Sequence, residues 1–169
     1  MPTPPNGRLA IFPGSFDPLT NGHVDIVLRS AHLFERILVA VLVNPDKKPL
    51  FTAEERVAII RDVFKEYANV EVDSFNGLLV DYARKRRASA IIRGIRAVSD
   101  YEYEFQMALM NRHLEPMLET VFMMPAEQYT YLSSRLTKEV FNLGGDVTGL
   151  VPPAVEQAMR RKQDAGVRG

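Results

Sequence analysis

Cysteine and tryptophan are absent from this chain of 169 residues, and no charge sign or long apolar run dominates it. The missing cysteines exclude disulfides, thiolate nucleophiles and Cys-based metal sites. The longest fully apolar run, residues 37–43, is too short to cross a bilayer. Lys plus Arg and Asp plus Glu both number 21, so no overall field attracts nucleic acid. We therefore expect neither a membrane nor a nucleic-acid partner.

The three histidines lie far apart in the sequence, and none forms a metal-ligand pair such as H-E-x-x-H. We therefore predict no metal site built by the protein. Residues 1–7 have no apolar core and do not resemble a signal peptide, which predicts a cytoplasmic protein. The length predicts one domain over residues 8–163, between a flexible arm at 1–7 and a frayed tail at 164–169.

Strand patterns and helix patterns alternate along the whole domain. The expected strands are 9–12, 36–43, 70–74, 88–92 and 119–123, and the helices begin near residues 23, 52, 78, 99, 133 and 153. Capping boxes at Thr52–Glu55 and Ser99–Glu102 mark two of these starts. The alternation predicts a single doubly wound, Rossmann-like α/β domain with a five-stranded parallel sheet. Ligands then bind at the carboxyl ends of the strands, so the loops there are the candidate site.

The loop after the first strand, Pro-Gly-Ser-Phe-Asp-Pro-Leu-Thr-Asn-Gly-His over residues 13–23, leads into a helix N-terminus. Free N–H groups and the helix dipole favour an anion there, and Gly14 and Gly22 let phosphate approach the backbone. Ser15 adds a hydroxyl, and a neutral His23 can donate one hydrogen bond. The loop matches neither a Walker loop nor G-x-G-x-x-G, so a plain turn capped by His23 is the alternative.

The loop after the fourth strand places Arg93 and Arg96 on either side of Gly94, just before a helix. Guanidinium groups match phosphate oxygens bidentately, so each arginine could take a phosphate. Asp100 and Glu104, four residues apart, could orient these arginines or meet the ribose or adenine. A surface network of ion pairs is the alternative.

Two stretches together resemble the signature of the nucleotidyltransferase superfamily: Gly-Ser-Phe-Asp-Pro at 14–18 and Thr-Asn-Gly-His at 20–23. In that superfamily the loop and its histidine hold the α-phosphate of a nucleoside triphosphate. Residues 92–104 (IRGIRAVSDYEYE), 110–114 (MNRHL) and 44–49 (NPDKKP) further resemble the bacterial phosphopantetheine adenylyltransferase family. The likeness runs from about residue 9 to residue 159.

This resemblance implies transfer of AMP from ATP to 4′-phosphopantetheine, giving dephospho-CoA and pyrophosphate. It also implies Mg²⁺ arriving with ATP, CoA as a product-like inhibitor, and a homohexamer. The implied catalytic residues are His23, Lys47 and Arg96, and the implied acceptor-binding residues are Ser15, Lys47, Leu79 and Arg93. The implied nucleotide-binding residues are Ser15, Phe16, His23, Gly94, Ile95, Arg96, Glu104, Tyr129, Thr130, Tyr131, Leu132, Ser133, Ser134 and Arg135. Without the resemblance, the pair Lys47–Lys48 is typical of a solvated basic turn.

The chain departs from the second superfamily signature, I-S-S-T-x-x-R, at three positions: Leu132, Arg135 and Lys138. It stays open whether Arg135 or Lys138 meets the β- and γ-phosphates, and Ser133 and Ser134 alone could be a helix cap. A phosphate nucleophile needs no general base, so catalysis would depend on positioning and charge. The alternatives are transfer to nicotinate mononucleotide, transfer from CTP to a phosphorylated alcohol, and a non-catalytic nucleotide sensor.

Overall fold

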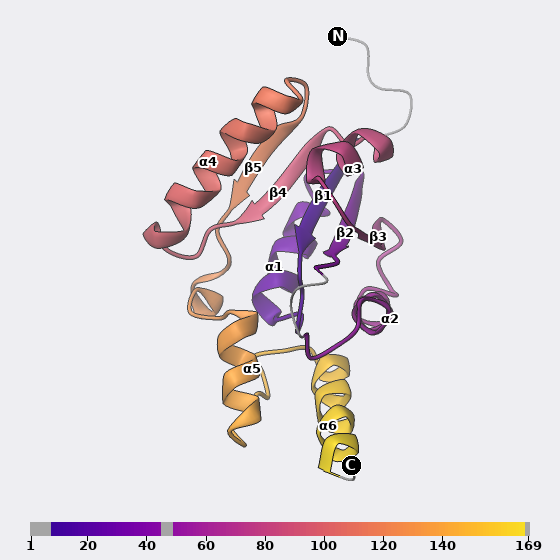
Figure 1. Ribbon diagram of the computed structural model, residues 1–169, viewed down its shortest axis with the longest axis vertical. Helices are drawn as coiled ribbons and strands as arrows, with labels where there is room; N and C mark the ends of the chain where they lie inside the picture. The colour runs from indigo at the N-terminus through magenta and orange to yellow at the C-terminus, as the bar shows by residue number, and fades with distance from the viewer. Residues whose placement is uncertain (1–7, 45–48, 168–169) are drawn as a thin grey trace.

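The computed structural model describes residues 8–44 and 49–167 of the chain. Within these residues, five parallel strands form one sheet in the order β3-β2-β1-β4-β5 (Figure 1). The strands are β1 (Leu9–Gly14), β2 (Arg36–Leu42), β3 (Val70–Phe75), β4 (Ala90–Gly94) and β5 (Glu119–Met123). The predicted α/β class and parallel sheet are confirmed. Because the strand order reverses between β1 and β4, the topological switch point lies at the carboxyl ends of these two strands.

The helices alternate with the strands up to β5 and then gather beyond the carboxyl edge of the sheet (Figure 1). They are α1 (Asn21–Ser30), α2 (Ala53–Val63), α3 (Leu79–Arg86), α4 (Val98–Leu114), the short 3₁₀ turn η1 (Glu127–Tyr129), α5 (Ser134–Asn142) and α6 (Pro153–Val167). Helix α6 continues past Asp164, where we expected the tail to begin. No helix of the described residues is both long enough and apolar enough to span a membrane.

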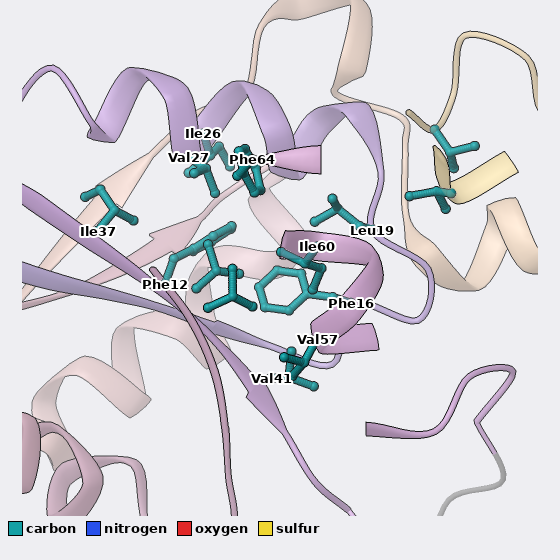
Figure 2. Packing of buried hydrophobic residues seen from close by; sticks show 14 of the residues in the cluster. Phe12, Phe16, Leu19, Ile26, Val27, Ile37, Val41, Val57, Ile60 and Phe64 are labelled. Atoms are coloured by element: carbon teal, nitrogen blue, oxygen red, sulfur yellow. The ribbon is translucent and has the colours of Figure 1, made fainter. Parts of the chain in front are cut away.

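The hydrophobic core has two layers because successive strand residues point to opposite faces of the sheet. Ala10 and Phe12 of β1 face a cluster built with α1, α2, α5 and α6, part of which Figure 2 shows. Leu9 and Ile11 face a smaller cluster built with α3. Strands buried on both faces explain the continuous apolar runs in the sequence.

The capping box expected at the start of α4 is wrong. The helix begins at Val98, and its N-cap, Ala97, makes no side-chain hydrogen bond, so Ser99 and Glu102 form no capping box. Ser99 lies inside the first turn rather than at the cap, where its hydroxyl would have to be. Farther along the helix, Tyr101 and Phe105 are 49% and 44% exposed. These two rings stack on one another, with 5.7 Å between centroids.

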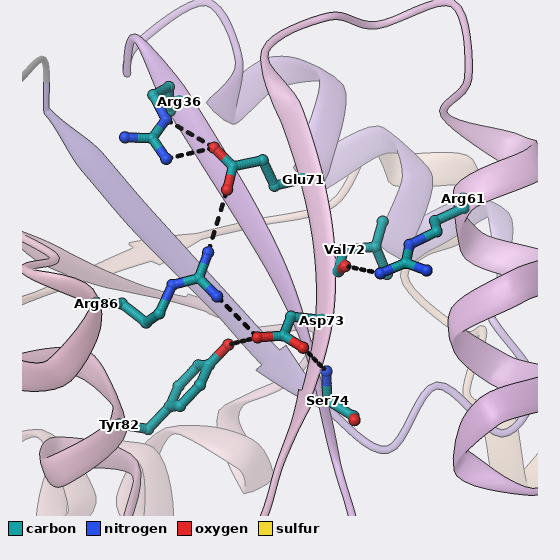
Figure 3. A network of polar contacts seen from close by, with 8 residues as sticks. All are labelled: Arg36, Arg61, Glu71, Val72, Asp73, Ser74, Tyr82 and Arg86. Atoms are coloured by element: carbon teal, nitrogen blue, oxygen red, sulfur yellow. Dashed lines mark hydrogen bonds and ion pairs between the residues drawn. The ribbon is translucent and has the colours of Figure 1, made fainter.

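The edge strand β3 carries a network of ion pairs (Figure 3). Glu71 accepts from Arg36 and Arg86, and Asp73 accepts from Arg86 and from the Tyr82 hydroxyl at 2.7 and 2.8 Å. Burial and the neighbouring Asp73 carboxylate raise the pKa of Tyr82 above its ordinary value. Charged side chains along an edge discourage pairing with a further strand, which gives this network a structural role away from the switch point.

Candidate active site

A cavity of about 330 Å³, the nucleotide cavity below, lies at the carboxyl ends of β1 and β4, next to the first turn of α1. It is the position expected for a doubly wound sheet. Most of the predicted nucleotide residues line it together: Ser15, Phe16, His23, Gly94, Arg96, Glu104, Tyr129, Leu132, Ser133 and Ser134. Ile95, Thr130, Tyr131 and Arg135 do not line it. Lys47, predicted for catalysis and acceptor binding, lies outside the described residues.

A second cavity of about 300 Å³, the arm cavity, adjoins the first through Gly14, Arg93 and Glu104. It brings the predicted acceptor residues Leu79 and Arg93 to one place. The rest of its wall is mainly apolar, from Phe75, Leu78, Tyr103, Met107 and Ala108. The cavity can therefore hold a long, weakly polar ligand beside the nucleotide.

Two polar groups in the arm cavity have no partner among the residues that the structure describes. Asn111 is only 5% exposed, and its side-chain amide makes no hydrogen bond. The Oγ1 atom of Thr120 is buried and also unpartnered. Buried polar atoms are almost always hydrogen-bonded, so the Thr120 hydroxyl, with the unpaired Asn111 amide in the same cavity wall, favours a ligand that carries donors and acceptors along an apolar chain.

His23 is held at the third position of α1 by a capping box with Thr20. Its Nδ1 atom accepts the backbone N–H of Thr20 at 3.0 Å, while Thr20 Oγ1 accepts the backbone N–H of His23 at 3.4 Å. Burial, and then the positive charge of Arg96, lower the pKa of His23 to about 4. The imidazole is thus neutral at pH 7, as predicted, and Nε2 is left to donate a hydrogen bond.

The side chain of Phe16 packs against the ring of His23. Its ring is 3% exposed and meets the His23 ring edge to face, with 5.2 Å between centroids. The ring also passes so close to Gly14 that a Cβ there would lie 2.9 Å from it. Phe16 has a φ of 49°, in the left-handed region that a bulky residue rarely adopts. The Phe16 side chain thus belongs to the core, and the residue also lines the nucleotide cavity.

The two arginines of the fourth loop are oriented by acidic residues, one of the possibilities left open by the sequence. Glu104 accepts from Nε and Nη2 of Arg93 at 2.7 and 2.6 Å, and Arg93 Nη1 reaches the Pro13 carbonyl at 3.2 Å. Arg96 pairs with Asp100 at 3.3 Å and donates to the Leu132 carbonyl at 2.7 Å. The bidentate edge of Arg93 is thus occupied by Glu104, so only its remaining N–H groups can meet a phosphate.

Helix α5 presents its first turn to the loop of residues 14–20, called the signature loop below. Ser133 caps the helix by accepting the N–H of Leu136 at 3.0 Å, and the Ser134 hydroxyl donates to the Pro18 carbonyl at 2.7 Å. A third cavity of about 450 Å³ lies here, lined by Ser15 and Ser134 together with Asp17, Arg56, Arg135 and Lys138. It adjoins the nucleotide cavity through Ser15 and Ser134.

The comparisons with known proteins agree with this geometry. Residues 11–140 match the cytidylyltransferase-like family. Curated relatives from Alkaliphilus metalliredigens and Heliobacterium modesticaldum, both named phosphopantetheine adenylyltransferase, are 56% identical over 155 and 161 residues. These alignments cover 92% and 95% of this chain, and 99% and 96% of the relatives. The chain belongs to the phosphopantetheine adenylyltransferase family.

A solved structure from Vibrio parahaemolyticus supports the fold. That protein, provisionally assigned as a nicotinate-nucleotide adenylyltransferase, superposes with a TM-score of 0.70 over 90% of this chain and 97% of its own. The sequences are 16% identical, so the likeness concerns the fold alone.

Three residues that hold this family site together were not singled out from the sequence. Thr20 fixes the tautomer of His23, Asp17 accepts two backbone N–H groups, and the buried Arg56 donates to the Ser15 carbonyl at 2.6 Å. Asp17 and Thr20 stand inside the signature itself, and Arg56 follows the Thr52 capping box. Their positions were available from the sequence, but their partners were not.

Among the described residues, no group of three His, Cys, Asp or Glu side chains is placed to hold a metal ion.

Proposed function

We propose that this protein transfers AMP from ATP to 4′-phosphopantetheine, giving dephospho-CoA and pyrophosphate. The observation that carries the proposal is that His23 lines the nucleotide cavity and that the mainly apolar arm cavity adjoins this cavity. The names of relatives more than half identical to this chain support the same reaction.

In this reaction the phosphate of the acceptor attacks the α-phosphorus of ATP in line. The new P–O bond forms as the bond to the β-phosphate oxygen breaks, and pyrophosphate leaves with that oxygen. The phosphate monoester is already anionic at neutral pH and needs no general base. The protein contributes positioning and charge stabilisation, which dominate phosphoryl-transfer catalysis.

His23 would donate its Nε2–H to a non-bridging oxygen of the α-phosphate. Its fixed tautomer makes this donor available without a protonation step. Arg96 and the first turn of α5 would steady the leaving pyrophosphate, and Lys47 would neutralise charge on the acceptor phosphate. Mg²⁺ would enter with the triphosphate as part of the substrate, held by phosphate oxygens and water.

The arm cavity favours phosphopantetheine over a nucleotide as the acceptor. Its apolar wall suits methylene and dimethyl groups, and the unpartnered Asn111 and Thr120 suit amide groups. Nicotinate mononucleotide carries a charged ring and a ribose, which this wall offers little to bind. The family resemblance further suggests a homohexamer and inhibition by CoA, and the exposed rings of α4 provide a surface for such an assembly.

The test is pyrophosphate release with ATP and Mg²⁺, measured with 4′-phosphopantetheine, with nicotinate mononucleotide, and without an acceptor. We expect release that depends on phosphopantetheine. Release with nicotinate mononucleotide alone would keep the adenylyl transfer and replace the acceptor. No release with either acceptor, in a protein that still binds ATP, would favour the nucleotide sensor.

A further inference from the structure

We propose that Asp17 and Lys138 form a positioning pair that docks α5 on the signature loop, so that Lys138 supports nucleotide binding without touching a phosphate. The inference deepens the proposed function, on which it rests for the identity of the nucleotide. It concerns the position where the superfamily signature closes with arginine and this chain has lysine.

Asp17 is a buried carboxylate whose acceptor sites are already engaged. It is 6% exposed, accepts the N–H of Phe51 on Oδ1 at 2.9 Å, and accepts the N–H of Leu50 on Oδ2 at 2.8 Å. Lys138 Nζ lies 2.9 Å from the same Oδ2. One carboxylate thus joins the signature loop, the segment that leads into α2, and α5.

Lys138 lies on the face of α5 that already contacts the signature loop. Ser134, four residues earlier and therefore one turn away on the same face, donates to the Pro18 carbonyl at 2.7 Å. Two successive turns of α5 are thus fixed to neighbouring residues of one loop, Asp17 and Pro18. This contact sets where Ser133 and Ser134 stand at the rim of the nucleotide cavity.

A direct contact between Lys138 and a phosphate would first have to break this ion pair. Only 8% of the Asp17 side chain is exposed, so losing Lys138 would leave a buried, uncompensated negative charge near the incoming triphosphate. Arg135 offers the contrast. It is exposed, lines the cavity of about 450 Å³, and has no ion pair within the described part of the chain. Of the two cations left open by the sequence, Arg135 is the one free to meet the β- and γ-phosphates.

A double-mutant cycle separates positioning from direct contact. The four proteins are the parent, Lys138→Met, Asp17→Asn and the double variant, and the probe is a non-hydrolysable ATP analogue titrated by calorimetry. If Lys138 acts through Asp17, Lys138→Met should weaken binding by about tenfold in the parent and by less than about twofold beside Asp17→Asn. Equal losses in both backgrounds would overturn the proposal, as would no loss in the parent.

Two further variants complete the design. Lys138→Arg keeps the charge next to Asp17 and should retain most of the affinity. Lys65→Met removes an exposed lysine that pairs with Asp62, and it should change nothing. If Asp17→Asn does not fold, a second comparison replaces the cycle: the binding of AMP and of the ATP analogue is measured for the parent and for Lys138→Met. A loss on Lys138→Met shared by AMP and the ATP analogue supports positioning, and a loss confined to the analogue overturns it. These titrations need no acceptor, so a failed acceptor assignment in the pyrophosphate assay stays distinguishable from a failure of the pair.

Discussion

The backbone N–H of Thr20 donates to Nδ1 of His23 across 3.0 Å. A ring nitrogen that accepts a hydrogen bond carries no proton, so the neutral imidazole carries its proton on Nε2. The same contact closes the capping box that starts α1. His23 therefore has two roles: it completes the cap at the start of α1, and it supplies the donor at the centre of the proposed reaction. The start of the helix fixes the orientation of its ring.

Replacing His23 with alanine should lower turnover by roughly 10²-fold or more, the usual cost of losing one preorganised donor to a developing oxyanion. The loss should fall on kcat, with the KM for ATP changing much less, because the donor acts mainly in the transition state. Steady-state pyrophosphate release at saturating substrates measures it, with circular dichroism as the check on folding. A folded variant with unchanged turnover would remove His23 from the mechanism.

The lowered pKa of His23 predicts a loss of stability in acid. The pKa is about 4 in the folded chain against an ordinary 6.5, so between these two pH values the unfolded chain binds more protons than the folded chain. Stability therefore rises with pH across this window and falls on acidification. From the two pKa values, titration of His23 lowers the free energy of unfolding by at most about 2 kcal/mol between pH 7 and pH 5.

His23→Gln is the matched variant for this measurement, because glutamine at the same position can still complete a capping box but does not titrate. Denaturant unfolding at pH 7 and pH 5 should show a smaller acid loss for the variant than for the parent. Imidazole resonances assigned by comparison with the variant should titrate with a midpoint near pH 4. A midpoint near 6.5 would contradict the desolvated, neutral imidazole.

Much of the site could be predicted because its residues stand together in the sequence. Residues 13–23 and 92–104 each follow a strand, and a parallel sheet brings the ends of its strands to one edge. That Asp100 and Glu104 could orient the two arginines was one of the options left open by the sequence, since they lie one turn apart on one helix, and the structure shows the pairs Arg96–Asp100 and Arg93–Glu104. Local spacing and the topology of the fold were sufficient for these residues.

The remaining features depend on contacts between segments far apart in the chain. Asp17 and Lys138 are separated by 121 positions, and nothing near either residue indicates the partner. The predicted capping box of α4 was wrong for a different reason. Ser99 and Glu102 have the spacing of a capping box, but the observed N-cap is Ala97, two residues before Ser99, so the spacing alone could not place the start.

Gly94 has no room for a side chain, so Gly94→Ala should destabilise the protein by about 1–3 kcal/mol. A Cβ there would lie 2.7 Å from Cδ1 of Ile26, a residue that is only 4% exposed. Ile26→Val removes that Cδ1 atom, and the double variant should lose less stability than the two single variants added together. Urea unfolding measures all four proteins. Gly166→Ala, where nothing lies within 4 Å, is the control and should cause no loss.

Asn111 should matter for the acceptor but not for stability. Asn111 lines the arm cavity at 5% exposure, and its side-chain amide has no hydrogen-bond partner among the described residues, so a variant loses no internal hydrogen bond. Asn111→Leu, which keeps the volume and removes the polar atoms, should leave the melting temperature unchanged or slightly raised. The KM for 4′-phosphopantetheine should rise by roughly fivefold to tenfold, the cost of about one hydrogen bond, while the KM for ATP stays constant.

The control for Asn111→Leu is Asn142→Leu, the same exchange at an exposed position near the end of α5. It should alter neither Michaelis constant. If the KM for 4′-phosphopantetheine rises and the KM for ATP does not, the effect lies in the arm cavity. A general disturbance of α4 would also move Glu104 and its partner Arg93, and would therefore change the KM for ATP. A lower melting temperature with both Michaelis constants unchanged would show that the amide supports the fold, and the acceptor would then be held by the apolar wall alone.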